Sequence, residues 1–391
     1  MHTTKKLTAS LLILLTCGLT TAQALAQPVP TRIGLNVERT GPIASYGLHA
    51  AIAAQLAVDE INKAGGVNGA PLELVVEDNR SSPEQAVIAT RNLADKGVVA
   101  MLGPVTTTVA RTAFPAANRA GLPTISPGSG LPGLTAQNRP WTFRNSALDG
   151  LIIDDLVRRL KADHPNLKNV VAVLDPKDPY ANFLIKNVAP PILEKNGLVI
   201  VNANALIEVP SDVTDFSVFV TRVKALNPDA VFVGLLHEAV PAFLKEALRQ
   251  RLKVPVFAGL GTITEGVSVA AKDIEVYAGQ PFDASADDAR VQAFVKEFRA
   301  RSEKQLPGQY STPIYADAGA YESVYLLADA MRTHKIDAKT EVVDARMKIR
   351  DYMTKVKDFK GLGNTLYINA EGDAVKTPLI FRTVNGVWKR F

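Results

Sequence analysis

The sequence predicts an α/β fold with two lobes, each built around a parallel sheet. Short runs rich in β-branched residues alternate with longer amphipathic segments from residue 31 onward. This alternation is typical of parallel strands joined by helical crossovers. The pattern restarts after residue 143, which indicates a second sheet. With 391 residues and 47% apolar content, the chain is long enough to bury two cores of ordinary size.

The first series of elements alternates strand and helix. Four apolar residues near one face favour a helix over 47–65. A second helix, over 82–97, begins with Ser82 as its cap and Pro83 in its first turn. The other expected elements are strands over 31–38, 72–79, 98–105 and 122–127 and a helix over 107–121.

The second series repeats the alternation. Its expected helices cover 150–165, 180–197, 215–229 and 238–253, and its expected strands cover 169–175, 198–206, 230–237 and 254–261. Beyond about residue 280, three helical segments precede a β-like C-terminus. Because this last section has too few strands for a sheet of its own, we expect it to complete the two lobes already begun.

The N-terminus predicts a signal peptide over residues 1–26 and therefore an exported protein. Lys5 and Lys6 precede an apolar segment, and a small-residue cleavage site ends at Ala26. An alternative is lipid attachment at Cys17, the only cysteine, which the threonine before it disfavours. If Cys17 leaves with the signal peptide, the mature chain can form no disulfide and depends on its core.

Charge and hydropathy argue against a nucleic-acid partner and against a membrane span. The formal charge of +5 includes Lys5 and Lys6, so the mature chain carries +3. Charges of both signs mix along segments such as "FVKEFRARSEKQ", which is typical of solvated helix faces rather than of a nucleic-acid-binding stripe. No run of 18 or more apolar residues follows the signal peptide. We therefore expect neither a nucleic-acid partner nor a membrane span.

Motifs for catalysis and cofactors lack the context that they need. The stretch "GSGLPG" over 128–133 has a dinucleotide-binding spacing, but it follows the fourth expected strand and Pro132 interrupts any helix after it. Ser129 is no nucleophile elbow, because Pro127 stands where that motif needs glycine. The five histidines show no metal-ligand spacing. We expect no enzyme, no cofactor and no metal; an exported hydrolase is the alternative from another class.

Three consecutive threonines, Thr106, Thr107 and Thr108, stand where an expected strand ends and an expected helix begins. One hydroxyl is explained by helix capping. The others, with the free N–H groups of a helix N-terminus, indicate an anion receptor at the carboxyl end of a strand, where open parallel sheets bind their ligands. A phosphate loop would add lysine and more glycine, so a carboxylate is the favoured anion.

A set of motifs runs over essentially the whole mature chain. The most specific is "DEINKAGGVNG" over 59–69. The others are "TGPIASYG", "GPVTTT", "GLPTISPGSGLPGLT", "TFRNSALD", "DPYA", "DAVFVGLLH" and Y-x-N-x-x-GD. With them the chain resembles the periplasmic solute-binding proteins of type I fold that serve branched-chain amino acid ABC transporters.

The resemblance implies two Rossmann-like lobes joined by three crossovers, which close on a small molecule. It places 28–143 with 280–362 in lobe 1 and 144–279 with 363–391 in lobe 2. It also implies a periplasmic, monomeric, non-enzymatic protein whose partners are the permease subunits of an ABC importer. A ligand sensor of the same fold is the alternative within this class.

The resemblance also implies a ligand site. By similarity, Thr107 with Thr106 would hold the ligand carboxylate, and Gly128 would offer a backbone carbonyl. The two matching aromatic positions are Tyr46 and Tyr180. The expected site also includes Ser129 and His237, which lie in expected turns at the ends of strands.

Three positions depart from the pattern of α-amino acid binders. Gly130 stands where a hydroxyl would help to hold the ammonium group, Leu236 replaces an aromatic, and Gly261 replaces the carboxylate that would neutralise the ammonium group. A buried ammonium without a counter-charge costs several kcal/mol. His237 or Glu238 could replace the missing charge. The favoured ligand is therefore a carboxylate with an apolar or aromatic body, and a branched-chain or other hydrophobic amino acid is the second choice.

Overall fold

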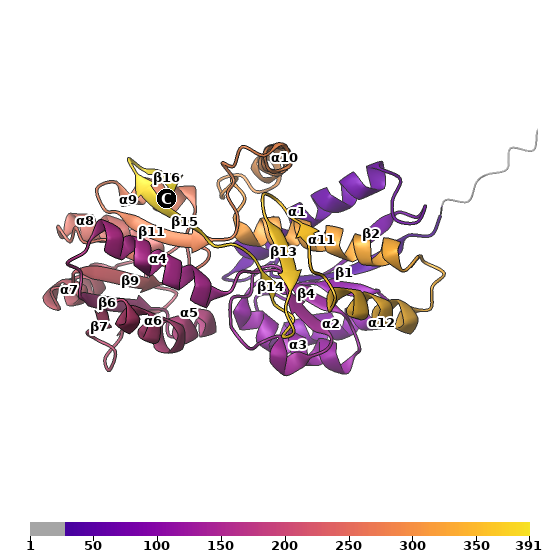
Figure 1. The fold of residues 1–391 in the computed structure, drawn as a ribbon, viewed down its shortest axis with the longest axis horizontal. Coiled ribbons are helices and arrows are strands. Elements are labelled where there is room, and N and C mark those ends of the chain that lie inside the picture. Colours follow the sequence, from indigo (N-terminus) through magenta and orange to yellow (C-terminus); the bar gives the residue numbers. More distant parts are fainter. Residues whose placement is uncertain (1–27) are drawn as a thin grey trace, which may run out of the picture.

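The computed structural model describes residues 28–391 and shows two lobes side by side (Figure 1). The expected signal peptide and Cys17 lie outside the described residues. Each lobe has a central sheet with helices on its faces, as the sequence predicts. Among residues 28–391, no helix is both long enough and apolar enough to cross a bilayer.

The first sheet is fully parallel and has the strand order β2-β1-β3-β4-β5. Its central strands β1, β3 and β4 are buried at every residue but Arg32, because helices cover both faces of the sheet. Its strands are β1 (Thr31–Val37), β2 (Leu72–Asp78), β3 (Ala100–Leu102), β4 (Thr124–Ser126) and β5 (Thr142–Arg144).

Helices from both ends of the described chain cover the first sheet. The cap of α2 is as predicted: the Ser82 side chain accepts from the Gln85 N–H, and Pro83 is the first helical residue. Helices α10 and α11 pack against α1 although they lie more than 200 residues later. The helices are α1 (Ala44–Lys63), α2 (Pro83–Asp95), α3 (Thr107–Arg119), α10 (Ala289–Gln305), α11 (Tyr315–Thr333) and α12 (Val342–Met353), with a 3₁₀ turn at Ala136–Asn138.

The second sheet has the order β16-β15-β11-β10-β9-β6-β7, and β8 also pairs with β6. Six of its eight strands, β8 included, pair in parallel, while β15 pairs antiparallel with β11 and β16 pairs antiparallel with β15 at one edge. The strands are β6 (Asn169–Leu174), β7 (Val199–Ile200), β8 (Ile207–Glu208), β9 (Ala230–Gly234), β10 (Val256–Ala258), β11 (Val276–Gln280), β15 (Leu379–Val384) and β16 (Val387–Arg390).

The helices of the second lobe include one that the sequence predicted as continuous over 180–197. The structure divides it into α5 (Pro179–Phe183), a π-helical turn (Leu184–Val188) and α6 (Ala189–Lys195). Pro190 and Pro191, in the first turn of α6, remove two backbone donors, which favours such an interruption. The remaining helices are α4 (Asp149–Asp163), α7 (Ser217–Ala225), α8 (Val240–Arg249) and α9 (Glu265–Ala271).

The expectation that the C-terminal section forms no sheet of its own is wrong. Strands β12 (Phe359–Lys360), β13 (Thr365–Ile368) and β14 (Ala374–Val375) make a small antiparallel sheet. The N–H of Ile368 donates to the carbonyl of Val356, just beyond α12. The resemblance placed residues 363–391 in lobe 2. In the two-lobe division that we propose, the small sheet belongs to lobe 1, so the last crossover comes after β14.

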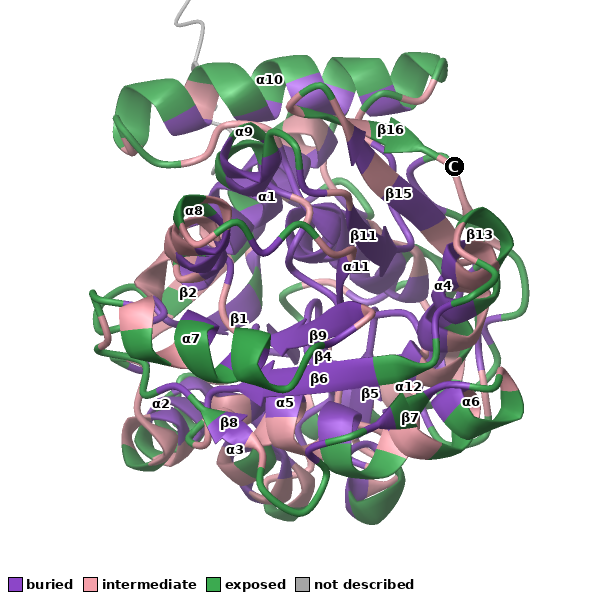
Figure 2. Ribbon diagram, turned by 90° about the vertical axis from the view of Figure 1, so that its left-hand side faces the viewer, coloured by how far each residue is buried: buried purple, intermediate pink, exposed green. Residues whose placement is uncertain are grey.

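The core of both lobes lies between the sheets and their helices, which present buried faces inward and exposed faces outward (Figure 2). The chain crosses between the sheets after β5, after β11 and after β14. These crossings bring the carboxyl ends of the parallel strands of the two sheets to face one another, and this region holds the candidate site.

Candidate functional site

A cavity of about 250 Å³ lies between the carboxyl ends of strands from both sheets. Residues after β1, β2, β3 and β4 line it from the first sheet, and residues after β6, β8, β9 and β10 line it from the second. Most of the wall is apolar. Its polar members are Ser81, Thr106, Thr107, Thr108, Asp175, Lys177, Asp178, Ser211 and Thr262, together with the tyrosines Tyr46, Tyr180 and Tyr315.

Thr107 begins helix α3 and is 4% exposed. Its hydroxyl oxygen accepts a hydrogen bond from the N–H of Gly130 at 3.2 Å and lies 3.1 Å from the hydroxyl of Ser129. The first N–H groups of a helix have no partner within the helix, and the helix dipole favours a negative charge there. The Thr107 end of the cavity therefore offers hydrogen-bond donors to an anion.

Thr106 differs from the prediction in two ways. It occupies the N-cap position of α3, but its side chain makes no capping bond. Instead, its hydroxyl and its N–H donate to the buried carboxylate of Glu38, at 2.8 and 3.0 Å. Burial raises the pKa of Glu38, and the bonds from Thr106 and Val105 oppose that rise. Thr106 lines the cavity, yet its donors serve the protein's own carboxylate.

Two polar contacts join the lobes at the cavity. The hydroxyl of Tyr46, on α1, lies 2.9 Å from Nδ1 of His237, and the Ser45 hydroxyl donates to Glu238. Glu238 also lies 3.2 Å from Nε2 of His237. Burial lowers the pKa of His237, which disfavours the imidazolium form. Thus His237 holds Tyr46 in place and does not itself line the cavity.

Tyr180, on α5, closes one side of the cavity. Its hydroxyl donates to Asp149 Oδ1 at 2.8 Å and accepts from the N–H of Leu260 at 3.1 Å. Asp149 is 1% exposed, and its Oδ2 atom has no hydrogen-bond partner. Burial raises the pKa of Asp149 to about 7, although Arg144 and Tyr180 act to lower it.

The glycines near these tyrosines leave no room for side chains. A Cβ atom on Gly130 would lie 2.5 Å from the Tyr180 ring, and one on Gly261 would lie 2.9 Å from the Tyr46 hydroxyl. Gly261 also has a φ of +89°, which favours glycine. In this chain, tyrosines therefore fill the space that side chains at residues 130 and 261 would occupy.

Tyr315, the first residue of α11, contributes a third ring to the cavity. Its hydroxyl donates to the carbonyl of Gly128 at 2.8 Å. The Gly128 carbonyl, which the resemblance offered to a ligand, is thus bonded to the protein.

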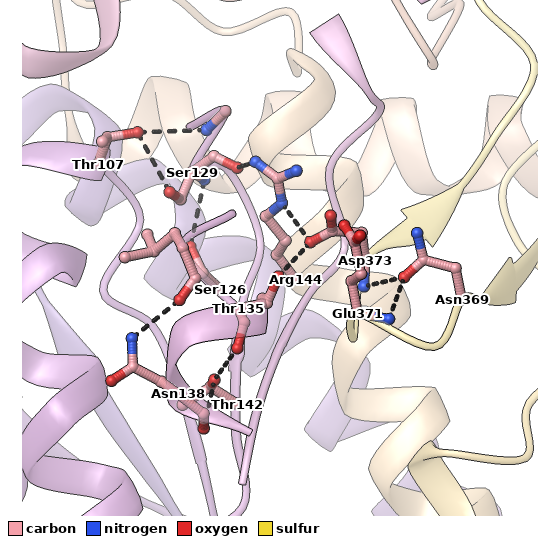
Figure 3. A network of polar contacts seen from close by, with 12 residues as sticks. Thr107, Ser126, Ser129, Thr135, Asn138, Thr142, Arg144, Asn369, Glu371 and Asp373 are labelled. Atoms are coloured by element: carbon pink, nitrogen blue, oxygen red, sulfur yellow. Dashed lines mark hydrogen bonds and ion pairs between the residues drawn. The ribbon is translucent and has the colours of Figure 1, made fainter. Parts of the chain in front are cut away.

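A buried ion pair supports the loop after β4 (Figure 3). Arg144 Nε and Asp373 Oδ1 lie 2.7 Å apart, and their side chains are 0% and 2% exposed. Arg144 also donates from Nη1 to the carbonyl of Ser129 at 3.2 Å, while Thr135 donates to Asp373. The network joins the turn that contacts Thr107 to the end of the small C-terminal sheet.

The structure brings most of the expected site residues together. The cavity is lined by Tyr46, Thr106, Thr107, Gly128, Gly130, Tyr180 and Leu236. Ser129, His237 and Gly261 do not line it and lie one contact behind it, against Thr107 and Tyr46. Their roles toward a ligand remain predictions.

Sequence reasoning missed several residues of this region, among them Glu38, Asp149, Tyr315 and the charged lining residues Asp175, Lys177 and Asp178. Glu38 directly follows a strand and Asp149 ends the "TFRNSALD" motif, so their positions carried a weak signal. Tyr315 lies about 190 residues from the loops that it contacts, and no local pattern could have linked them.

Comparison with known proteins gives a consistent family. The sequence profile of the family described as periplasmic binding protein matches residues 30–387. An amino acid binding protein of Pseudomonas aeruginosa is 30% identical over 72% of this chain and 74% of its own length. A leucine-, isoleucine-, valine-, threonine- and alanine-binding protein of the same organism is 26% identical over 73% and 75%.

Solved structures share the fold. The substrate-binding protein LivJ of Streptococcus pneumoniae, in complex with isoleucine, has a TM-score of 0.77 and 28% identity, covering 93% of this chain and all of its own. A solute-binding protein of Rhodopseudomonas palustris, in complex with benzoate, has a TM-score of 0.78 and 20% identity, covering 93% and 96%. The chain belongs to the periplasmic binding protein family, and its relatives are solute-binding proteins and not enzymes.

Proposed function

We propose that this protein is the periplasmic solute-binding component of an ABC importer and takes a small carboxylate-bearing ligand between its lobes. The observation that carries the proposal is the polarity of the cavity. Thr107 and the first turn of α3 offer donors at one end, and most of the remaining wall is apolar. An aromatic acid, an aliphatic acid and a hydrophobic or branched-chain amino acid all fit this description.

Closure of the lobes is the proposed mechanism. A ligand that contacts both sheets binds the closed arrangement better than an open one and so stabilises it. The direct contacts of Tyr46 with His237 and of Ser45 with Glu238 support such an arrangement. We propose that a monomer delivers the ligand to permease subunits that bind the closed form.

An amino acid is the second candidate for the ligand. The names of two relatives and the ligand of one solved structure favour it. So does the unpartnered Oδ2 atom of Asp149, which could accept from an ammonium group. Against it, Asp149 lies behind Gly130 and the Tyr180 ring and does not line the cavity.

A thermal-shift screen tests the proposal. We expect benzoate, isovalerate or leucine to raise the melting temperature of the mature protein in a concentration-dependent way, because a ligand that binds only the folded state stabilises it. No shift with any of the three would contradict the carboxylate class. Recovery of the ligand unchanged after incubation separates binding from hydrolysis.

The transport role needs a separate experiment. Cells that lack the gene should fail to accumulate the radiolabelled compound that gives the shift, and a plasmid copy should restore uptake. If cells that lack the gene take up the compound normally but show altered gene expression, the result would instead support the alternative role of a ligand sensor.

A further inference from the structure

Three tyrosine rings line the cavity, from helices of both lobes. Tyr46 is on α1, Tyr180 on α5 and Tyr315 on α11. Each hydroxyl has a protein partner: Nδ1 of His237 for Tyr46, Asp149 and the Leu260 N–H for Tyr180, and the Gly128 carbonyl for Tyr315. Because the hydroxyls are engaged, the rings offer a ligand chiefly their carbon surface.

Two of these rings occupy space that is free only because the neighbouring residues are glycines. A Cβ atom on Gly130 would lie 2.5 Å from a carbon of the Tyr180 ring, and a Cβ atom on Gly259 would lie 2.6 Å from the Tyr180 hydroxyl. A Cβ on Gly261 would approach the Tyr46 hydroxyl to 2.9 Å. Real Cβ atoms essentially never make contacts this short. The positions of the rings therefore depend on these glycines, and any larger residue would displace a ring.

The cavity has room for one ring with a carboxylate. Its volume is about 250 Å³, and a dry apolar cavity of about 150 Å³ is large enough to bind benzene. The donors lie at the Thr107 end, and apolar residues such as Ile43 and Leu184 make up most of the remaining wall, which also carries the charged side chains of Asp175, Lys177 and Asp178. Aromatic rings attract one another in offset-stacked or edge-to-face arrangements beyond the effect of buried area.

We propose that the site selects a monocyclic aromatic carboxylate, with Tyr46, Tyr180 and Tyr315 as its specificity-determining residues. The inference rests on the proposed function and narrows its ligand class. The carboxylate lies at Thr107, and the ring of the ligand lies among the three tyrosine rings.

Benzoate and cyclohexanecarboxylate make a matched pair of probes, because they share the carboxylate and the six-membered ring and differ in aromaticity and thickness. We expect calorimetric titration to show that the wild-type protein binds benzoate at least tenfold more tightly than cyclohexanecarboxylate. Leucine, titrated in parallel, should bind more weakly than benzoate. Equal affinity for the matched pair, or a preference for leucine, would overturn the proposal while leaving carboxylate binding intact.

Two variants of one residue locate the selectivity. Tyr315→Phe keeps the ring and should retain the benzoate preference to within threefold, whereas Tyr315→Leu should reduce the preference by at least fivefold. The ratio of the two affinities is the readout, because loss of folded protein lowers both affinities together and leaves their ratio unchanged. An unchanged ratio in Tyr315→Leu would overturn the role of this ring. If none of these three probes binds but isovalerate does, the specificity proposal fails and the proposed function stands; if isovalerate does not bind either, both fail.

Discussion

The carboxylate of Glu38 accepts hydrogen bonds from both the N–H and the hydroxyl of Thr106, at 3.0 and 2.8 Å. A bond from the Val105 N–H at 3.3 Å adds to them. All three residues belong to the first lobe, so the contact does not require a ligand. The protein's own carboxylate thus occupies part of the anion receptor that the three threonines predicted, and Thr107 is left to face the cavity.

Replacing Thr106 with valine should lower stability and leave ligand affinity nearly unchanged. The variant removes one hydrogen bond to the buried Glu38 carboxylate, and such bonds contribute about 1.5–3 kcal/mol. Chemical denaturation measures the loss in the free energy of unfolding, and calorimetric titration measures affinity. A large loss of affinity with an unchanged unfolding curve would mean that Thr106 binds the ligand.

Gly130→Ala should destabilise the protein by about 1–3 kcal/mol, because the new methyl group overpacks the Tyr180 ring. Gly150→Ala is the matched control, since a Cβ at that position of α4 meets nothing within 4 Å. In a protein that already carries Tyr180→Ala, Gly130→Ala should lower the free energy of unfolding much less than it does in the wild type, because the two residues are in contact. Thermal unfolding of these variants checks the coupling; strictly additive costs would argue against it.

Asp373→Asn should destabilise the protein by about 3–5 kcal/mol, because it removes the ion-pair partner of the buried Arg144. It should also weaken ligand binding, since Arg144 holds the Ser129 carbonyl beside Thr107. The matched control is Asp358→Asn, which breaks an ion pair with Lys360 whose side chains are 70% and 69% exposed. Similar denaturation curves for the two variants would contradict a structural role for the Arg144 pair.

Stability should depend on pH through Asp317, the third residue of α11. Burial raises the pKa of this carboxyl to about 8 from its ordinary value of 3.8. The folded state therefore binds the proton more tightly than the unfolded chain does. The stabilisation is fully present below about pH 4 and is lost as the pH rises toward 8.

Asp317→Asn should remove this dependence, because asparagine keeps an acceptor for the Ile314 N–H and carries no proton to lose. Between pH 5 and 8, the wild-type free energy of unfolding should fall relative to the variant by up to about 1.4 kcal/mol per pH unit. Denaturation curves at several pH values measure the difference. Parallel profiles for the two proteins would contradict the raised pKa.

The sequence predicted most of the fold because the signals for its elements are local. Ser82 and Pro83 defined the start of α2, and alternating strand and helix patterns defined both lobes. Local patterns did include Pro190 and Pro191, which favour the π-helical interruption of the 180–197 helix, but they were interpreted as one continuous helix. Local patterns missed the small sheet near the C-terminus, because its strands are only two to four residues long.

The lining of the cavity was predictable where a motif ended a strand, as at Thr107 and Gly130. It was not predictable where function depends on distant pairs. The Glu38 contact with Thr106 spans 68 residues, and the Tyr315 contact with Gly128 spans 187. Pairings of this kind are decided by the fold, and they change which donors remain for a ligand.

The most direct test of the account compares Thr107→Val with Thr106→Val by calorimetric titration against benzoate and leucine. Each substitution replaces a threonine hydroxyl with a methyl group at one of two neighbouring residues, and only Thr107 is proposed to bind the ligand carboxylate. For whichever probe the wild-type protein binds, Thr107→Val should lose at least about tenfold in affinity, or about 1.4 kcal/mol, while Thr106→Val stays close to wild type. Wild-type affinity in Thr107→Val would contradict the central claim.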